Sequence, residues 1–195
     1  MSAPIVTPRF GDWIQTYSLR QFWPLDPRAE DVAIEDISHA LSMMCRFTGH
    51  VHHFYSVAEH SVRVSEYAES IAPAALRVLV ARWGLLHDAS EAYLVDVARP
   101  VKRLPGMAPY REAEALVMAA IIERFGLCPK EPAEVREADM RLLYTEARDL
   151  FPGVHPAWTW HGEPLPAPYI ITPWSQAEAK ARFVERFHHL FGGAA

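Results

Sequence analysis

Cysteine is scarce in this chain, and long apolar runs are missing from it. The two cysteines, Cys45 and Cys128, form no CxxC pair, so we expect two reduced thiols and no disulfide framework. No stretch approaches the roughly 18 consecutive apolar residues that a membrane span needs. The N-terminus also lacks the apolar segment of a signal peptide. These absences predict a soluble, cytoplasmic protein without a membrane partner.

Positive charge is also in short supply. Nineteen Lys and Arg stand against 24 Asp and Glu, which gives a net charge of −5 with His neutral. A protein that binds duplex nucleic acid normally presents an excess of basic residues, so that class of partner is not expected. An anionic substrate would need local cations to hold it against the net charge. Internal repeats and low-complexity segments are absent, which argues against a repeat architecture.

The remaining composition is that of an ordinary globular domain. Half of the 195 residues are hydrophobic and 22% are charged. Residues 1–33 carry four prolines and no helical period, while residues 13–17 and 20–23 have the composition of short strands. A two-stranded ribbon is not stable alone. We therefore expect residues 1–33 to form an extended arm or hairpin that packs on a body formed by residues 34–195.

From residue 34 onward, apolar residues recur at spacings of three and four, which predicts an all-α fold. Thr172 and Pro173 are expected to be the N-cap and the first residue of the last helix. Residues 151–171 contain five prolines and are predicted to form a long irregular loop. Trp158 and Trp160 could close over a base as a lid or anchor the loop on the body, and anchoring is favoured. The expected helices span residues 34–47, 56–72, 74–86, 91–97, 109–126, 132–150 and 172–191.

A histidine and an aspartate stand together, as His87-Asp88, at the end of the most apolar of these helices. His60 lies on the apolar stripe of the preceding helix, and Asp139 lies among inward-facing residues of a later one. An aspartate at the end of a buried helix is costly without a counter-charge or a metal. Together the four residues would offer a mixed nitrogen and oxygen ligand set. Taken singly, each has an ordinary explanation as a buried histidine or a solvated acid, and spacing alone does not bring three helices together.

The pattern His60 … His87-Asp88 … Asp139 resembles the H…HD…D signature of the HD-domain phosphohydrolase superfamily. Residues 55–61, 87–91 and 138–139 are similar to the branch that contains bacterial 5′-deoxynucleotidases and phage deoxynucleotide triphosphohydrolases. The resemblance covers roughly residues 34–150 and implies an HD-domain helical bundle. It also implies that these four residues hold one divalent transition metal: Mn, Co, Fe, Ni or Zn.

The same resemblance implies roles for further residues. Glu91 stands where the family activates or orients the attacking water, and Asp96 matches an acid that faces the substrate. Arg46 is expected to grip the substrate phosphate. Phe47 would lie near the sugar or base, although the 5′-deoxynucleotidases prefer tryptophan there, which leaves selectivity for deoxyribose open. The remaining candidates for substrate contacts are His50 and Lys102, and Glu59 is a candidate for fixing the tautomer of a ligand histidine.

Three alternatives compete with a nucleotide phosphohydrolase. Alarmone hydrolases usually carry Glu-Asp after the HD pair, whereas this chain has Glu91-Ala92. Cyclic-nucleotide phosphodiesterases usually hold two metals, and no further histidine lies between Asp88 and Asp139. A non-catalytic nucleotide-binding protein on the same scaffold would commonly lose a ligand or the water-activating acid, and all five positions are intact here.

We therefore expect an enzyme that hydrolyses (deoxy)nucleoside 5′-phosphates, either as a nucleotidase or as a triphosphohydrolase. Hydrolysis of another phosphorylated small molecule and non-catalytic nucleotide binding remain the alternatives. The family habit implies a homodimer or a larger homo-oligomer.

Overall fold

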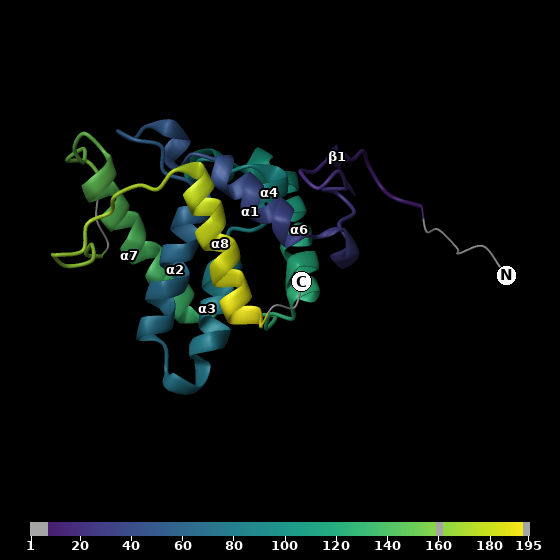
Figure 1. Cartoon of the computed structure of the whole chain (residues 1–195). Coiled ribbons are helices and arrows are strands. Elements are labelled where there is room, and N and C mark those ends of the chain that lie inside the picture. Colours follow the sequence, from purple (N-terminus) through teal and green to yellow (C-terminus); the bar gives the residue numbers. More distant parts are fainter. Residues whose placement is uncertain (1–7, 159–161, 193–195) are drawn as a thin grey trace.

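Helices account for 59% of the residues and strands for 3% in the computed structural model, which confirms the all-α prediction. The structure describes residues 8–158 and 162–192 (Figure 1). Within these residues, no helix combines the length and the apolar character that a membrane crossing requires. The longer helices are α1 (Ile34–Met43), α2 (Val57–Ile71), α3 (Arg77–Leu86), α6 (Ala108–Phe125), α7 (Ala133–Leu150) and α8 (Gln176–Phe191).

The predicted hairpin is present near the N-terminus. Strand β1 (Ile14–Gln15) pairs antiparallel with β2 (Gln21–Phe22), so that Ile14 lies opposite Phe22. Phe22 is fully buried and stacks on Tyr93 with 3.8 Å between ring centroids. The buried Asp36 carboxylate accepts a hydrogen bond of 2.6 Å from the backbone N–H of Ser18, at the hairpin turn. The hairpin is therefore held on α1 and on the chain that follows α3.

Helix α2 lies at the centre of the bundle, where it packs against α1, α3, α7 and α8 (Figure 1). The closest approach is to α3, because a Cβ added at Gly84 would lie only 2.8 Å from Cα of Ser65. Ser65 Oγ donates a 2.7 Å hydrogen bond to the carbonyl of Ala81 across the same contact. This close packing brings the middle of α2 next to the end of α3, where two of the candidate metal ligands lie.

Short elements connect the long helices. They are the 3-10 turns η1 (Ala29–Asp31), η2 (Arg46–Gly49), η3 (Ala74–Leu76) and η4 (Pro105–Met107), and the short helices α4 (Glu91–Leu94) and α5 (Arg99–Lys102). Helix α4 ends three residues earlier than predicted, because Val95 has φ +69° and cannot continue a right-handed helix. Helix α5 occupies a segment expected to be a loop, with Pro100 in its first turn, where no backbone N–H is needed.

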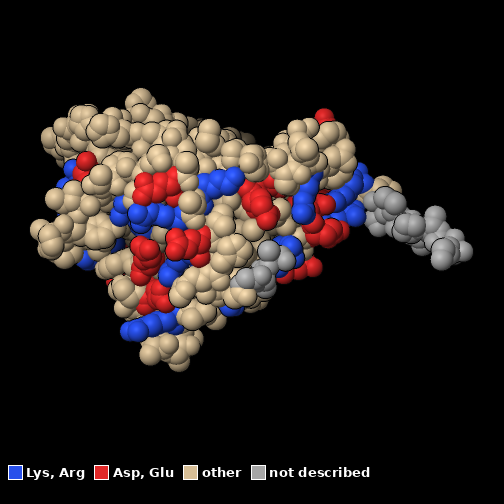
Figure 2. All heavy atoms as spheres, in the orientation of Figure 1, with Lys and Arg blue, Asp and Glu red and all other residues tan. Residues whose placement is uncertain are grey.

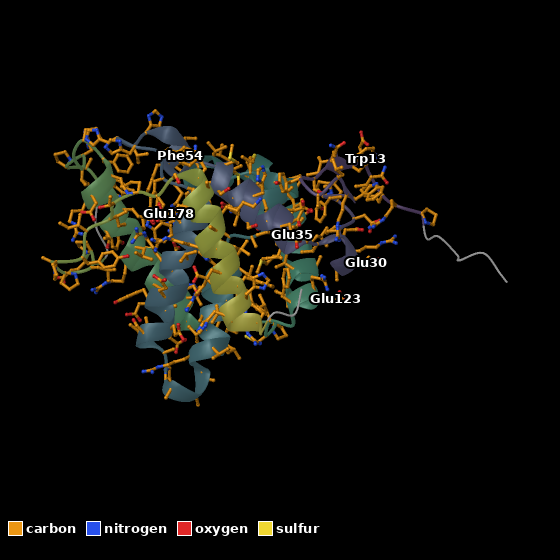
Figure 3. All side chains as sticks on the ribbon, viewed as in Figure 1. Trp13, Glu30, Glu35, Phe54, Glu123 and Glu178 are labelled. Carbon is orange, nitrogen blue, oxygen red and sulfur yellow. The ribbon has the colours of Figure 1, made fainter. Side chains whose placement is uncertain are left out.

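Two further boundary predictions were wrong. The first helix ends at Met43, four residues early, and residues 46–49 turn sharply. The last helix begins at Gln176, because Ser175 and not Thr172 accepts the capping hydrogen bond, from the N–H of Glu178 (Figure 3). Two apolar residues near the start of α3, Leu76 and Leu79, remain 44% and 38% exposed. They lie at the α2–α3 turn, which projects beyond the neighbouring helices (Figure 1).

Acidic and basic residues alternate on the surface around α2 and α8. Figure 2 shows Lys and Arg beside Asp and Glu over this face, with no broad area of one sign. Ion pairs within the face include Arg186 with Glu69 and Arg182 with Glu178. This face therefore offers no basic surface for a polyanion, in line with the charge balance of the sequence.

Candidate metal centre

His60 and His87 meet between α2 and the end of α3, with 3.3 Å between their Nε2 atoms. The Nδ1 atom of His87 lies 2.8 Å from the carbonyl oxygen of Gly84, and that of His60 lies 2.6 Å from Oε1 of Glu146. A carbonyl and a carboxylate can only accept, so both Nδ1 atoms donate. In the neutral rings this leaves the two Nε2 lone pairs free to ligate a metal, at the same point in space.

Two carboxylates complete this group. Asp139 Oδ1 lies 3.3 Å from His60 Nε2, while Asp88 Oδ2 lies 3.2 Å from His87 Nε2 and 3.7 Å from His60 Nε2. Ligand atoms about 2.1 Å from one ion lie roughly 3.0–3.4 Å apart in tetrahedral or octahedral geometry. One ligand atom from each of His60, His87 and Asp139 lies within 4.8 Å of the other two, so these three residues can hold a metal ion, and Asp88 adjoins them. The structure thus brings together all four residues of the predicted set.

Glu91 adds to a concentration of buried acid beside this group. Its side chain is only 7% exposed, and its Oε2 atom has no hydrogen-bond partner among the described residues. Burial, followed by the charges of Asp88 and Asp96, raises the pKa of Glu91 to about 9. Burial and Asp88 also raise the pKa of Asp96, which outweighs the opposing effect of Arg46. A bound cation would offset the repulsion among these buried carboxylates. The acids beside the candidate ligands are therefore consistent with a metal ion at this position.

The ligand histidines are held by their acidic neighbours. Burial alone would lower the pKa of His87, but the adjacent Asp88 carboxylate raises it to about 10. Burial and Arg46 would lower the pKa of His60, yet Glu146 and Asp139 raise it overall. The same attraction lowers the pKa of Asp88 and of Asp139, despite the opposing effect of burial. The carboxylates therefore stay ionised near neutral pH, and protons compete with a metal for the imidazoles.

Glu146 is a site residue that the sequence did not reveal. It lies on α7, two turns after Asp139, and its side chain is fully buried. Besides the contact with His60, its Oε1 accepts a 3.0 Å hydrogen bond from the hydroxyl of Tyr55. Its Oε2 accepts a 3.2 Å hydrogen bond from Nε of Arg46 and lies 3.1 Å from NH2 of the same guanidinium in an ion pair. Its only signal in the sequence is the seven-residue spacing from Asp139, which places both on one face of a helix.

Glu59, in contrast, was wrongly expected to fix a histidine tautomer. Its Oε1 accepts from Nε of Arg63 at 3.0 Å, and its Oε2 accepts from the backbone N–H of Trp174 at 2.8 Å. The adjacent His60 projects from a different side of α2, toward α3 and α7. Glu59 therefore joins α2 to the segment that precedes α8, and Glu146 takes the role predicted for it.

The metal-binding group opens into a cavity of about 710 Å³. Of the ten residues predicted for the site, the buried His60 and the half-buried His87 are not among the residues that line the cavity. Eight line it: Arg46, Phe47, His50, Asp88, Glu91, Asp96, Lys102 and Asp139. Arg46 NH1 lies 3.6 Å from Asp88 Oδ2. Lys102 forms an ion pair with Glu114. Arg99 also lines the cavity and adds positive charge on the α5 side.

Aromatic side chains form another part of the cavity lining. Phe47 meets Phe151 edge to face at 4.9 Å, and Phe151 meets Trp158 at 5.7 Å. Phe47 and Thr48 have φ values of +56° and +52°, a conformation that costs free energy in residues other than glycine and often marks functional sites. Trp158 contacts Phe151, which belongs to the same predicted loop, and both residues line the cavity. The anchoring of this loop on the body stays a prediction, and Trp160 lies outside the described residues.

Comparison with known proteins identifies relatives along most of the chain. The uncharacterized protein YfdR of Escherichia coli (strain K12) is 36% identical over 181 residues, which cover 91% of this chain and 95% of that protein. An uncharacterized protein of Rhodobacter capsulatus is 38% identical over 131 residues, which cover 65% of this chain and 64% of that protein. No family model matches the chain. Neither name states an activity.

Proposed function

This chain belongs to the same protein family as YfdR of Escherichia coli, and we propose that it is a metal-dependent phosphohydrolase acting on (deoxy)nucleoside 5′-phosphates. One observation carries the proposal: the imidazoles of His60 and His87 and the carboxylates of Asp88 and Asp139 converge at the base of one cavity. This ligand arrangement is the one that the HD-domain phosphohydrolase resemblance implies. It supports assigning the chain to that superfamily.

The four ligands would hold one divalent transition metal: Mn, Co, Fe, Ni or Zn. Such an ion supplies an activated water near neutral pH and a Lewis acid for a phosphate oxygen. Glu91 lines the same cavity, and its Oε2 has no partner among the described residues, so it is free to hold the attacking water and accept its proton. A nearby cation lowers the pKa of Glu91 from about 9, which favours the carboxylate that this role needs.

The cavity offers contacts to the phosphate of a nucleotide and to its sugar or base. Arg46 directs NH1 toward the metal ligands, and Arg99 and Lys102 add positive charge, so a phosphate is held beside the reacting centre. Phe47 and Phe151 present ring surface to a sugar or base. The volume of about 710 Å³ lies within the range of about 300–1,000 Å³ that is usual for small-molecule sites.

The proposed phosphate-binding residues do not distinguish a monophosphate from a triphosphate. The test is product analysis with Mn²⁺ or Co²⁺ and a panel of ribo- and deoxynucleoside mono- and triphosphates. Release of inorganic phosphate from monophosphates identifies a nucleotidase, while inorganic triphosphate identifies a triphosphohydrolase. The Asp88→Ala variant should lose both metal and activity, and surviving activity would overturn the site assignment. A metal-loaded protein that converts no nucleotide would refute the proposed substrate class.

The alternative to catalysis is a nucleotide-binding protein on the same scaffold. It is disfavoured because the four ligands and Glu91 are all present and meet at one cavity. Equilibrium binding of nucleotides to metal-loaded protein, without turnover, would be the signature of this alternative.

A further inference from the structure

The Glu146 carboxylate makes contacts on both sides of the candidate site. Through Oε1 it contacts Nδ1 of His60 at 2.6 Å and Tyr55 Oη at 3.0 Å. Through Oε2 it accepts a 3.2 Å hydrogen bond from Nε of Arg46 and forms an ion pair with NH2 at 3.1 Å. Both oxygens are thus occupied by partners on different elements, since His60 lies on α2, Arg46 on η2 and Glu146 on α7.

These contacts leave one nitrogen of Arg46 directed at the cavity. The Nε and NH2 atoms of the guanidinium are engaged by Glu146, while NH1 lies 3.6 Å from Asp88 Oδ2. Because the guanidinium is planar, holding one of its edges also sets the direction of NH1. The orientation of the proposed phosphate-binding group is therefore set by the same carboxylate that sets the tautomer of a metal ligand.

A second buried carboxylate–arginine pair provides a comparison within the same molecule. Glu59 is fully buried and binds Arg63 and the backbone N–H of Trp174. It has the same chemistry and the same burial as Glu146, but its hydrogen bonds reach neither a metal ligand nor Arg46. An effect that is specific to the site should therefore appear at Glu146 and not at Glu59.

We propose that Glu146 is a positioning residue that couples the metal centre to phosphate binding, by fixing His60 with one oxygen and Arg46 with the other. The part that concerns Arg46 rests on the proposed function, whereas the part that concerns His60 rests on the metal site alone. The coupling means that a disturbance at this one carboxylate weakens metal binding and phosphate binding together.

Replacement of Glu146 by Gln shows why the carboxylate is needed. If the amide NH2 group faces Arg46, two donors oppose each other and the guanidinium loses its partner. If the NH2 group faces His60, Nδ1 must accept, so the proton moves to Nε2 and the ring can no longer ligate through that atom. Either orientation of the amide removes one of the two contacts outright. The loss of the negative charge weakens the remaining contact as well, so both metal binding and phosphate binding should weaken.

The experiment measures metal and phosphate binding separately in the full-length protein. Calorimetric titration with Co²⁺, together with the visible absorption of the bound ion, reports the metal site. Titration of the Co²⁺-loaded protein with inorganic phosphate reports Arg46 without requiring turnover. For Glu146→Gln we expect Co²⁺ affinity to fall by about 10- to 100-fold, a changed absorption spectrum and phosphate affinity reduced by about tenfold. Glu59→Gln is the matched control and should stay within about twofold of wild type in both titrations.

Two further comparisons protect the test against a variant that fails to fold. Tyr55→Phe removes one hydrogen bond to Glu146 with little change in volume, and it should shift both affinities in the same direction by a smaller factor. Glu146→Asp keeps the charge but is one methylene shorter, so it should restore only one of the two affinities. Equal affinities in wild type, Glu146→Gln and Tyr55→Phe would overturn the proposal. So would parallel losses in Glu146→Gln and Glu59→Gln, because the effect would then be general destabilisation.

The outcomes also separate this inference from the proposed function. If the wild-type protein binds Co²⁺ and phosphate but hydrolyses no nucleotide, the proposed function fails, while the two titrations still decide the role of Glu146. If nucleotides are hydrolysed, the Glu146→Gln variant should raise KM for the substrate even at saturating metal, because Arg46 is misdirected.

Discussion

The base of the cavity and its wall are built in different ways. The base comprises the candidate metal ligands His60, His87, Asp88 and Asp139, which project from α2, the end of α3 and α7, three elements in direct contact. The wall comprises η2, α5 and the loop at residues 151–158, which are short or irregular. Close helix packing holds the base, as the Gly84–Ser65 contact shows, whereas turns and ring contacts hold the wall.

This difference suggests that the base of the cavity and its wall have separate functions. Atoms that must share one ion need positions accurate to a fraction of an ångström, and packed helices provide that accuracy. A wall that contacts the substrate tolerates more variation, because loops can change residues without disturbing the core. Substitutions in the base should therefore affect metal binding and fold together, while those in the wall should affect substrate binding alone. The following variants test that separation.

The largest effect on rate is expected at Glu91, which lies where the base meets the wall. Glu91→Gln removes the proton acceptor but keeps the shape of the side chain. We expect kcat to fall by about 10²- to 10⁴-fold. Co²⁺ affinity should fall much less than in Asp88→Ala, because Glu91 affects the ion through its charge and is not among the four proposed ligands. Steady-state kinetics at saturating metal, with a parallel Co²⁺ titration, measure both. A variant that retains wild-type kcat would remove Glu91 from the mechanism.

A single added methyl group at Gly84 should disturb the base. The new Cβ would lie 2.8 Å from Cα of Ser65, so α3 must move away from α2. Although alanine has the better helix propensity, we expect Gly84→Ala to be destabilised by about 1–3 kcal/mol and to lose Co²⁺ affinity. Gly106→Ala is the control, because nothing lies within 4 Å of its Cβ. Urea unfolding of both variants decides this, and equal stability would contradict the packing argument.

The pH dependence of metal binding should also report on the base. The pKa of His87 is raised to about 10 by Asp88 and that of His60 is raised as well, so protons compete with the metal below these values. Co²⁺ affinity should therefore rise with pH between 6 and 8, by about tenfold per unit for each proton displaced. In the metal-free protein, the stabilisation from protonated His87 is complete below its unfolded pKa and is lost as the pH rises toward 10. Affinity that is flat with pH would show that the histidines are not ligands.

The smallest effect is expected in the wall. Phe47→Ala removes a ring from the cavity lining, and an aromatic contact of about 1 kcal/mol corresponds to roughly a fivefold rise in KM for a nucleotide. Metal affinity should not change, because Phe47 contacts none of the ligands in the base. Trp13→Ala, on the hairpin (Figure 3), is a control that should leave both quantities unaltered. A loss of metal affinity in Phe47→Ala would break the separation between base and wall.

Helical periodicity explains why much of the base could be predicted. His60 lies on an apolar stripe, and His87-Asp88 follows the most apolar helix, so each carried a local signal of burial beside potential ligand chemistry. The helices were predicted from apolar residues at spacings of three and four, and the hairpin from its strand-like composition. The resemblance then supplied what spacing does not contain, namely that three helices converge.

The contacts that cross between elements could not be predicted in the same way. In the sequence, Glu146 is not distinguished from a solvent-exposed acid on a helix. Its role depends on contacts with Tyr55 and Arg46, which lie 91 and 100 residues earlier in the chain. Glu59, immediately before His60 in the chain, was the wrong choice because adjacent helical residues point about 100° apart. Phe47 takes a positive φ that its residue type disfavours, so local preference gave no sign of the turn.

The most direct test follows one protein sample through a Co²⁺ titration while visible absorption and phosphate or triphosphate release from deoxynucleotides are recorded together. The proposed site predicts that one equivalent of Co²⁺ binds and that hydrolysis increases in proportion to the bound metal. It also predicts that the Asp88→Ala variant shows neither change. Hydrolysis that proceeds equally without metal, or Co²⁺ binding that survives in Asp88→Ala, would contradict the assignment of this centre.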